Sequence, residues 1–308
     1  MRRSALLVLF LATGLHGLPA RADGDVQTPR VQAALAQAQA AEVGRGIGKN
    51  LMLAMALYCD AGTMGSGEGF FHVGRVLASA PGALRNPGLA NSYLALATRL
   101  GNTQALQYYD PRVDNVLLGD PCGAFAAGLH TQSFDIEAYL SRQPRARQKI
   151  AASIRSAARQ YKVDERLALA IALVESNLDP AVVPEGGAQG VMQLATAARQ
   201  NSGGPRIVDG EQDIRAALAY LGQLHERFAG DWRSMATAYD AGAGSVGRCG
   251  AVPPHPCLET RQYVRRVLYF AGASPGEQPG VARQAPAAAR SPHRGGVADK
   301  RADLPCCG

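Results

Sequence analysis

The residue with the clearest capacity for chemistry is Glu175, which ends a long apolar stretch. Leu167, Ile171 and Val174 precede it at helical spacing, so the stretch predicts a helix whose buried edge carries the Glu175 carboxyl. Burial and the negative end of the helix dipole both disfavour the ionised carboxyl, and both therefore raise its pKa. A carboxyl that stays protonated near neutral pH can act as the general acid in glycosidic cleavage. On the helix pattern alone, a helix-terminal Glu satisfied by its neighbours is the commoner meaning.

Four short sequence words surround Glu175 and favour the catalytic interpretation. They are ESNLDP from Glu175, GAQGVMQL from Gly187, AYDAG from Ala238, and ET with YV at Glu259 and Tyr263. In this order they resemble the soluble lytic transglycosylases, a family of lysozyme-like enzymes that cleave bacterial peptidoglycan. The resemblance covers residues 150–271 and implies an all-α, lysozyme-like fold for this part of the chain.

The resemblance implies a mechanism with a single carboxyl. Glu175 would protonate the oxygen between N-acetylmuramic acid and N-acetylglucosamine, and the 6-hydroxyl of the muramic acid would then close a 1,6-anhydro ring. Tyr239 would lie against Glu175 and hold its carboxyl in place. The residues expected to contact the glycan are Ser176, Gly190, Met192, Gln193, Asp240 and Tyr263. Packing explains Met192 and Tyr263 equally well, and the Gln193 amide could instead satisfy the local backbone.

The sequence departs from the family pattern at several positions. Val183 stands where the family usually has Ser, Asp240 replaces an Asn, and Leu194 is not followed by the usual Pro. An acid near Glu175 would raise its pKa further by like-charge repulsion. Three alternatives therefore stay open beside the lyase: a hydrolytic muramidase of the same fold, a catalytically weak peptidoglycan-binding protein, and an envelope scaffold.

The first residues predict export. Arg2 and Arg3 precede an apolar run from Ala5 to Leu18, and Ala20-Arg21-Ala22 forms an Ala-x-Ala cleavage site. Residues 1–22 therefore predict a signal peptide, a periplasmic location and no stable membrane span after cleavage. The first cysteine lies far downstream of this site, so we expect no lipid anchor.

The chain has six cysteines, and in an exported protein these predict disulfides. Cys249 with Cys257 would close a small ring beside the groove, and Cys59 with Cys122 is a second candidate pair. Paired CxxC motifs and His clusters are missing from the sequence, so we expect neither a metal nor a cofactor.

The remaining sequence divides into four parts. Residues 23–140 predict helical hairpins that resemble the Sel-like relatives of tetratricopeptide repeats, with an offset on the order of thirty-five residues; a helical prodomain or cap is the alternative. A linker is expected at 141–149, the catalytic domain at 150–271 and a disordered basic tail at 272–308. The repeats would bind an envelope protein partner. The net charge of +7 is not accompanied by interleaved aromatic residues, so we expect no nucleic-acid partner.

Overall fold

The computed structural model describes residues 27–123, 125, 134–182, 190–195, 198, 210–247 and 258–273. All regular secondary structure in these ranges is helical, which confirms the predicted all-α class. The predicted signal peptide and residues 274–308 of the predicted tail lie outside these ranges.

The N-terminal part consists of four helices that pack in succession, each on the next. They are α1 (Pro29–Val43), α2 (Leu51–Thr63), α3 (Gly67–Ser79) and α4 (Pro87–Arg99). Each begins with a side-chain oxygen that accepts a backbone N–H of the first turn, because the first amides of a helix have no partner within it. These capping residues are Thr28, Asn50, Ser66 and Asn86. The Sel-like repeat pattern stays a prediction.

Helix α2 is buried on all sides, with every residue from Leu53 to Gly62 inside the protein. A helix that is apolar all round belongs in the centre of its domain, and α2 lies between α1 and α3. A disulfide joins Cys59 on α2 to Cys122, which is the second of the two predicted pairs. Short 3-10 helices lie at Gly82–Leu84 (η1) and Thr103–Gln107 (η2).

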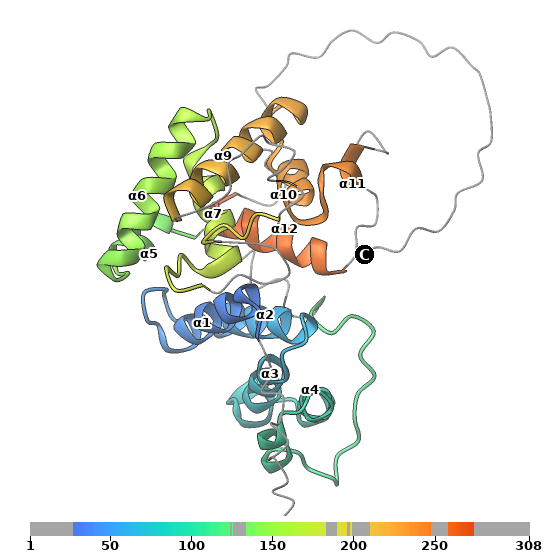
Figure 1. Cartoon of the computed structure of the whole chain (residues 1–308). Helices are drawn as coiled ribbons and strands as arrows, with labels where there is room; N and C mark the ends of the chain where they lie inside the picture. The colour runs from blue at the N-terminus through green and yellow to red at the C-terminus, as the bar shows by residue number, and fades with distance from the viewer. Residues whose placement is uncertain are drawn as a thin grey trace, which may run out of the picture.

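The C-terminal part is a bundle around α7. Its helices are α5 (Ile136–Ser141), α6 (Arg145–Gln160), α7 (Glu165–Ser176), α9 (Gly210–Arg227), α10 (Trp232–Ala241), α11 (Ala243–Gly247) and α12 (Leu258–Phe270). Helix α7 packs against α6, α12 and α1 (Figure 1). The sequence predicted one buried stripe on this helix, but all residues from Leu167 to Ser176 are buried, because neighbours cover it from several directions.

The predicted linker at 141–149 is largely helical. Helix α6 begins at Arg145, directly after Pro144, because Arg, Ala, Gln and Lys are good helix formers and their polar face can remain in water. Upstream of the linker, Phe134 packs against Tyr269 and Phe270. The structure thus places the residues around α5 with the C-terminal bundle.

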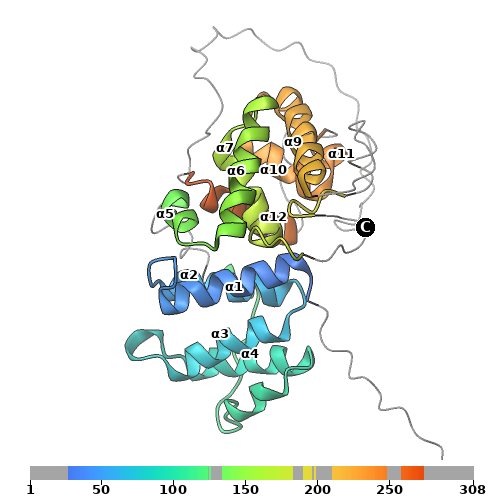
Figure 2. The ribbon, with the colours of Figure 1, turned by 60° about the vertical axis from the view of Figure 1, so that its left-hand side comes forward.

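The two parts meet along α1 and α2, which lie between α3 and α4 on one side and the C-terminal helices on the other (Figure 2). The amide of Gln37 on α1 donates to the Leu173 carbonyl of α7 at 2.9 Å, and Thr63 of α2 donates to Gln262 of α12 at 2.7 Å. Among the described helices, none combines the length and apolarity that crossing a membrane requires.

Candidate active site

Glu175 lies in the last turn of α7, and the local sequence fixes both ends of that helix. Asp164 caps the start by accepting hydrogen bonds from the amides of Arg166 and Leu167, as Asp commonly does at this position. Asn177 ends the helix in the left-handed conformation, with φ of 54°, which Asn adopts more readily than most residues. The Glu175 side chain between these ends is 0% exposed.

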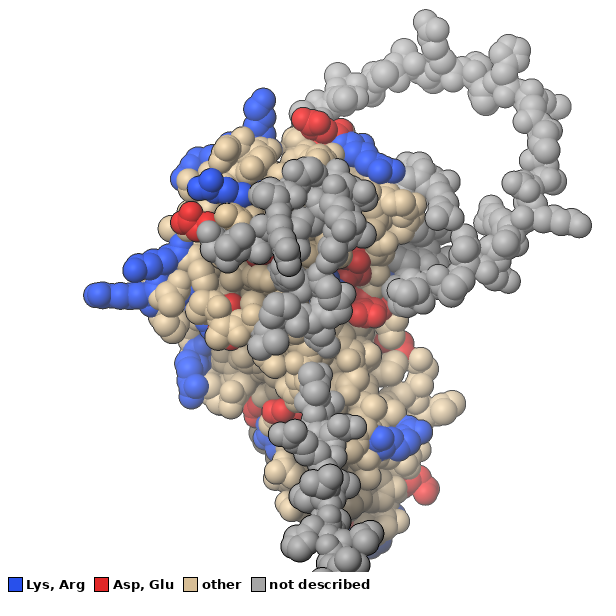
Figure 3. Space-filling view, viewed as in Figure 1, with Lys and Arg blue, Asp and Glu red and all other residues tan. Residues whose placement is uncertain are grey.

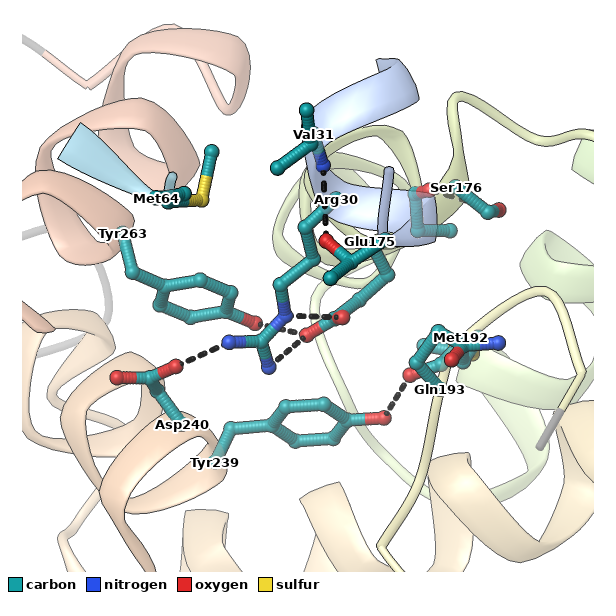
Figure 4. Close-up of polar contacts among 12 residues, drawn as sticks. Arg30, Val31, Met64, Glu175, Ser176, Met192, Gln193, Tyr239, Asp240 and Tyr263 are labelled. Atoms are coloured by element: carbon teal, nitrogen blue, oxygen red, sulfur yellow. Dashed lines mark hydrogen bonds and ion pairs between the residues drawn. The ribbon is translucent and has the colours of Figure 1, made fainter. Parts of the chain in front are cut away.

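Both carboxylate oxygens of Glu175 are hydrogen-bonded to Arg30, which comes from the first turn of α1 (Figure 4). Arg30 Nε lies 2.7 Å from Oε2, and Nη2 lies 2.9 Å from Oε1. The same guanidinium donates to Asp240 Oδ1 on α10 at 2.5 Å, and it lies 4.7 Å from the centre of the Tyr263 ring. One arginine from the N-terminal part therefore bridges two acids of the C-terminal bundle.

The phenol that contacts Glu175 belongs to Tyr263 and not to Tyr239. Tyr263 on α12 donates to Glu175 Oε1 at 2.9 Å, whereas Tyr239 on α10 donates to the Met192 carbonyl at 2.8 Å. The Tyr239 hydroxyl thus satisfies a buried backbone carbonyl in this structure, and a catalytic part for Tyr239 stays a prediction. Tyr263, which packing alone would have explained, takes the position beside the carboxyl.

Burial raises the pKa of the Glu175 carboxyl above its ordinary value. The Arg30 guanidinium and the Tyr263 hydrogen bond oppose this rise, and the Asp240 charge adds to it, in the direction that the sequence predicted. Burial alone would lower the pKa of Arg30, but the neighbouring charges of Glu175, Tyr263 and Asp240 raise it well above its usual range. Arg30 is therefore a permanent cation.

Asp240 has a partner for each of its oxygens. Arg30 donates to Oδ1, and Thr260 Oγ1 donates to Oδ2 at 2.7 Å. A carboxylate at this position can be buried because a guanidinium faces it. Asp240 thus has a cationic partner, Arg30 of α1.

The other predicted site residues lie at the end of α7 and in the segment from Gly190 to Gln193. Ser176 donates to the Val191 carbonyl at 2.7 Å, and the Gln193 amide donates to the Gly190 carbonyl at 2.6 Å. Met192 is fully buried. In this structure these side chains serve the local backbone and the core, and their contact with a glycan stays a prediction.

Gly190 occupies a position that no other residue could fill without rearrangement. Its φ is +71°, and a Cβ atom there would lie 2.0 Å from the Asp213 carboxylate, so both the backbone and the available space require glycine. Val183, Cys249 and Cys257 lie outside the described residues.

Two hollows adjoin the Glu175 cluster. The larger, of about 440 Å³, contains Tyr239 and Asp240 in its wall, together with parts of α9 and α11. The smaller, of about 140 Å³, lies between the start of α1 and the end of α7 and is lined by Pro29 and Ser176 among others. Pro29 and Ser176 are the chain neighbours of Arg30 and Glu175, and Asp240 accepts a hydrogen bond from Arg30, but neither Arg30 nor Glu175 lines either hollow.

Arg30 is the residue that sequence reasoning missed. Its one sequence-level signal is its position, because a cation in the first turn of a helix lies at the positive end of the helix dipole and is unfavourable there. Within the described ranges, no three His, Cys, Asp or Glu side chains lie close enough together to hold a metal ion.

Comparison with known proteins identifies the region that contains Glu175. Residues 152–253 match the family model described as Transglycosylase SLT domain. The chain is similar to membrane-bound lytic murein transglycosylase C of Photorhabdus laumondii subsp. laumondii, with 34% identity over 154 residues that cover 37% of this chain and 43% of that protein. It is also similar to the protein of that name from Yersinia pestis, with 33% identity over 141 residues, covering 40% and 39%.

The chain spans less than half of the length of these curated relatives. No solved structure matches it. Glu175, Tyr239 and Asp240 all fall inside the matched range, and the chain therefore carries an SLT-type transglycosylase domain.

Proposed function

We propose that the protein is a peptidoglycan lytic transglycosylase in which Glu175 is the general acid and then the general base. The observation that carries this proposal is a single fully buried carboxyl at the end of α7, with a pKa raised by burial, inside a transglycosylase SLT domain. The relatives named as lytic murein transglycosylases support the same activity.

In the first step, the protonated Glu175 gives its proton to the glycosidic oxygen as the bond to C1 of N-acetylmuramic acid breaks. The acetamido group of that sugar stabilises the positive charge that develops at C1. In the second step, the Glu175 carboxylate removes the proton of the 6-hydroxyl while the oxygen of that hydroxyl forms a bond to C1. This closes the 1,6-anhydro ring and returns Glu175 to its starting protonation state, so water is not consumed.

The neighbouring residues support these steps by position. Tyr263 donates to Oε1 of Glu175 and would orient the carboxyl. Oε2 accepts from Arg30 and could carry the proton once that hydrogen bond is broken. The hollow beside Tyr239 and Asp240 would hold the sugar ring next to the scissile bond. Glycan contacts by Ser176 and Gln193 belong to the same proposal.

The substrate would be the glycan strands of the cell wall, and the site of action would be the periplasm. Lys and Arg side chains gather along the edge formed by α5 and α6 (Figure 3), including the exposed Arg142, Arg145 and Lys149. Such an edge favours an anionic polymer through long-range attraction. An envelope protein partner for α1–α4 also stays a proposal.

A second candidate function is a peptidoglycan-binding protein without turnover. The observation in its favour is that Arg30 and Tyr263 together occupy both oxygens of Glu175. A carboxyl held in this way cannot donate a proton to a glycan.

The test is mass spectrometry of the muropeptides that the protein releases from purified sacculi. Glu175→Gln keeps the shape of the side chain but removes the proton donor, so we expect release to fall by about 1,000-fold. Glu165→Gln is the matched control, since Glu165 lies in the first turn of the same helix and pairs with Arg159 on the surface.

The products distinguish the alternatives. Anhydro-ended muropeptides that disappear in Glu175→Gln and persist in Glu165→Gln would establish the lyase. Products with reducing ends would change the assignment to a hydrolase. Sacculus binding without any products, in all variants, would favour the binding protein.

A further inference from the structure

We infer that the first turn of α1 closes the active site, with Arg30 acting as an internal plug that must withdraw before a glycan strand can reach Glu175. This inference rests on the proposed function, and it concerns the regulation of that same site. The plug belongs to the N-terminal part of the chain, whereas the carboxyl that it covers belongs to the transglycosylase domain.

The plug removes both oxygens of Glu175 from use. Nε and Nη2 of Arg30 each take one oxygen, and Tyr263 donates a further hydrogen bond to Oε1. The result is a carboxylate that is 0% exposed. A general acid must lie within hydrogen-bonding distance of the oxygen that it protonates, and here the guanidinium fills that position.

The plug also lies beside the hollow through which a glycan would approach. The larger hollow ends at Asp240, which Arg30 contacts directly, and the smaller hollow ends at Pro29 and Ser176. Arg30 thus contacts one wall residue of the larger hollow, and its chain neighbour Pro29 lines the smaller one. Withdrawal of Arg30 would free Glu175 and Asp240 to meet a glycan that enters from the larger hollow.

The position of Arg30 does not help the helix on which it lies. A cation in the first turn of α1 faces the positive end of the helix dipole, and burying a guanidinium costs free energy that only its partners offset. Within the described ranges, its ionic partners lie on the transglycosylase domain, namely Glu175 on α7 and Asp240 on α10. Arg30 therefore stabilises the protein through its contacts with Glu175 and Asp240 and not through α1 itself.

The closed contact is able to open. The Arg30 side chain is 25% exposed, so it has a path to water, where a charged guanidinium is well solvated. Deeper in α1, the buried Gln37 ties the helix to α7 through the Leu173 carbonyl and Asn177 Oδ1. The first turn can thus separate from Glu175 by bending or by a shift of α1, and the Gln37 contacts oppose the shift.

The experiment compares Arg30→Ala with the wild-type full chain on soluble, uncrosslinked glycan strands. A plug lowers the fraction of open protein and so raises the glycan concentration needed for half-maximal rate. We expect Arg30→Ala to lower this concentration by at least about tenfold, while the maximal rate changes by less than about threefold. Arg75→Ala is the matched control, because Arg75 is 26% exposed and pairs with Glu42 within the N-terminal part. It should leave both quantities unchanged.

A second variant, Gln37→Ala, leaves Arg30 and its charge in place but removes a tie that holds α1 on α7. A plug predicts that this variant also lowers the half-saturating concentration, by a smaller factor than Arg30→Ala. If Arg30 merely adjusts the protonation of Glu175, Gln37→Ala should leave the half-saturating concentration unchanged. Thermal unfolding followed by circular dichroism establishes that each variant is folded.

The outcomes separate this inference from the proposed function. If the wild type cleaves glycan and Arg30→Ala has an equal or higher half-saturating concentration, the plug is overturned and the lytic activity stands. If neither protein nor Arg75→Ala cleaves glycan at any concentration, the proposed function fails and the regulation fails with it.

Discussion

Two fully buried carboxylates, Glu175 and Asp60, each face arginine from the opposite part of the chain, but their bonding differs. Both oxygens of Glu175 accept hydrogen bonds from Arg30. On α2, Asp60 Oδ1 accepts from Arg265 of α12 at 2.7 Å. Its Oδ2 lies 4.0 Å from Arg266 Nε and accepts no hydrogen bond from the described residues.

The comparison shows that burial alone does not mark a carboxyl as catalytic. The larger hollow reaches Asp240, which shares Arg30 with Glu175, and no described residue that contacts Asp60 lines either hollow. Arg30 and Arg265 are similarly exposed, at 25% and 20%, but Asp60 has a second arginine beside it, Arg266, which is sealed in the interior. We therefore interpret the Asp60 contact as a permanent tie between the two parts of the chain and the Glu175 contact as one that can open.

The largest expected effect that tests this comparison is on stability. Arg265→Ala removes the one hydrogen bond to a buried carboxylate, so we expect the free energy of unfolding to fall by about 3 kcal/mol. Arg30→Ala should cost only about 1 kcal/mol, because water from the adjoining hollows can hydrate Glu175. Urea unfolding followed by circular dichroism measures both. An equal loss in the two variants would mean that the Glu175 site is as sealed as the Asp60 site.

Arg265→Ala also tests the comparison through the pH dependence of the unfolding free energy. Burial raises the pKa of Asp60 while Arg265 and Arg266 oppose the rise, so the loss of Arg265 raises this pKa further. A carboxyl with a raised pKa in the folded state favours folding at low pH, and this advantage is lost as the pH rises through that pKa. The unfolding free energy of Arg265→Ala should therefore fall more steeply between mildly acidic and neutral pH than that of the wild type.

An intermediate effect is expected on the maximal rate of muropeptide release. It distinguishes the roles of Tyr263 and Tyr239. Tyr263→Phe removes the hydrogen bond to the carboxyl, so we expect about a tenfold lower maximal rate of muropeptide release. Tyr239→Phe removes the donor to the Met192 carbonyl and should reduce stability by about 1 kcal/mol with little change in maximal rate. A larger loss of maximal rate in Tyr239→Phe than in Tyr263→Phe would mean that Tyr239 positions the carboxyl.

The smallest expected effect is a shift of the pH profile. The groups that face Glu175 are Arg30 from α1, Tyr239 and Asp240 from α10, and Tyr263 and Arg266 from α12. A general acid is active only while protonated, so the rate falls as the pH rises through its pKa. Asp240→Asn removes a negative charge that raises this pKa and should move the falling limb to lower pH. Tyr263→Phe should move it to higher pH, and a common direction for both variants would contradict this electrostatic account.

Much of the fold follows from local patterns. Helix α2 begins at Leu51, because its apolar run has the length of a buried helix and Asn50 caps it. Glu175 was identified because its burial follows from its spacing to Ile171, which is a property of one helix. Disulfides were expected from the export context, and Cys59 with Cys122 was the second of two candidate pairs; the sequence did not determine the pairing.

The rest depends on contacts that a local pattern does not contain. Arg30 and Glu175 are separated by 145 positions, and an isolated Arg at the start of a helix is typical of a surface residue. The sequence placed Tyr239 beside the Glu175 carboxyl, whereas the structure has Tyr263 there. The cause is related, because both tyrosines lie on amphipathic helices that face Glu175. Which phenol reaches the carboxyl is set by how α10 and α12 pack, and spacing along the chain does not determine it.

The disulfide between Cys59 and Cys122 has a consequence for limited proteolysis. The bond closes a covalent ring that contains α3, α4 and the exposed residues Leu106 and Leu117. A single protease cut inside this ring leaves α1 and α2 covalently attached to the transglycosylase domain, and Arg30 stays beside Glu175. After a cut inside this ring, release of α1 and α2 requires reduction as well, so the cover of the active site withstands such a nick for as long as the surroundings are oxidising.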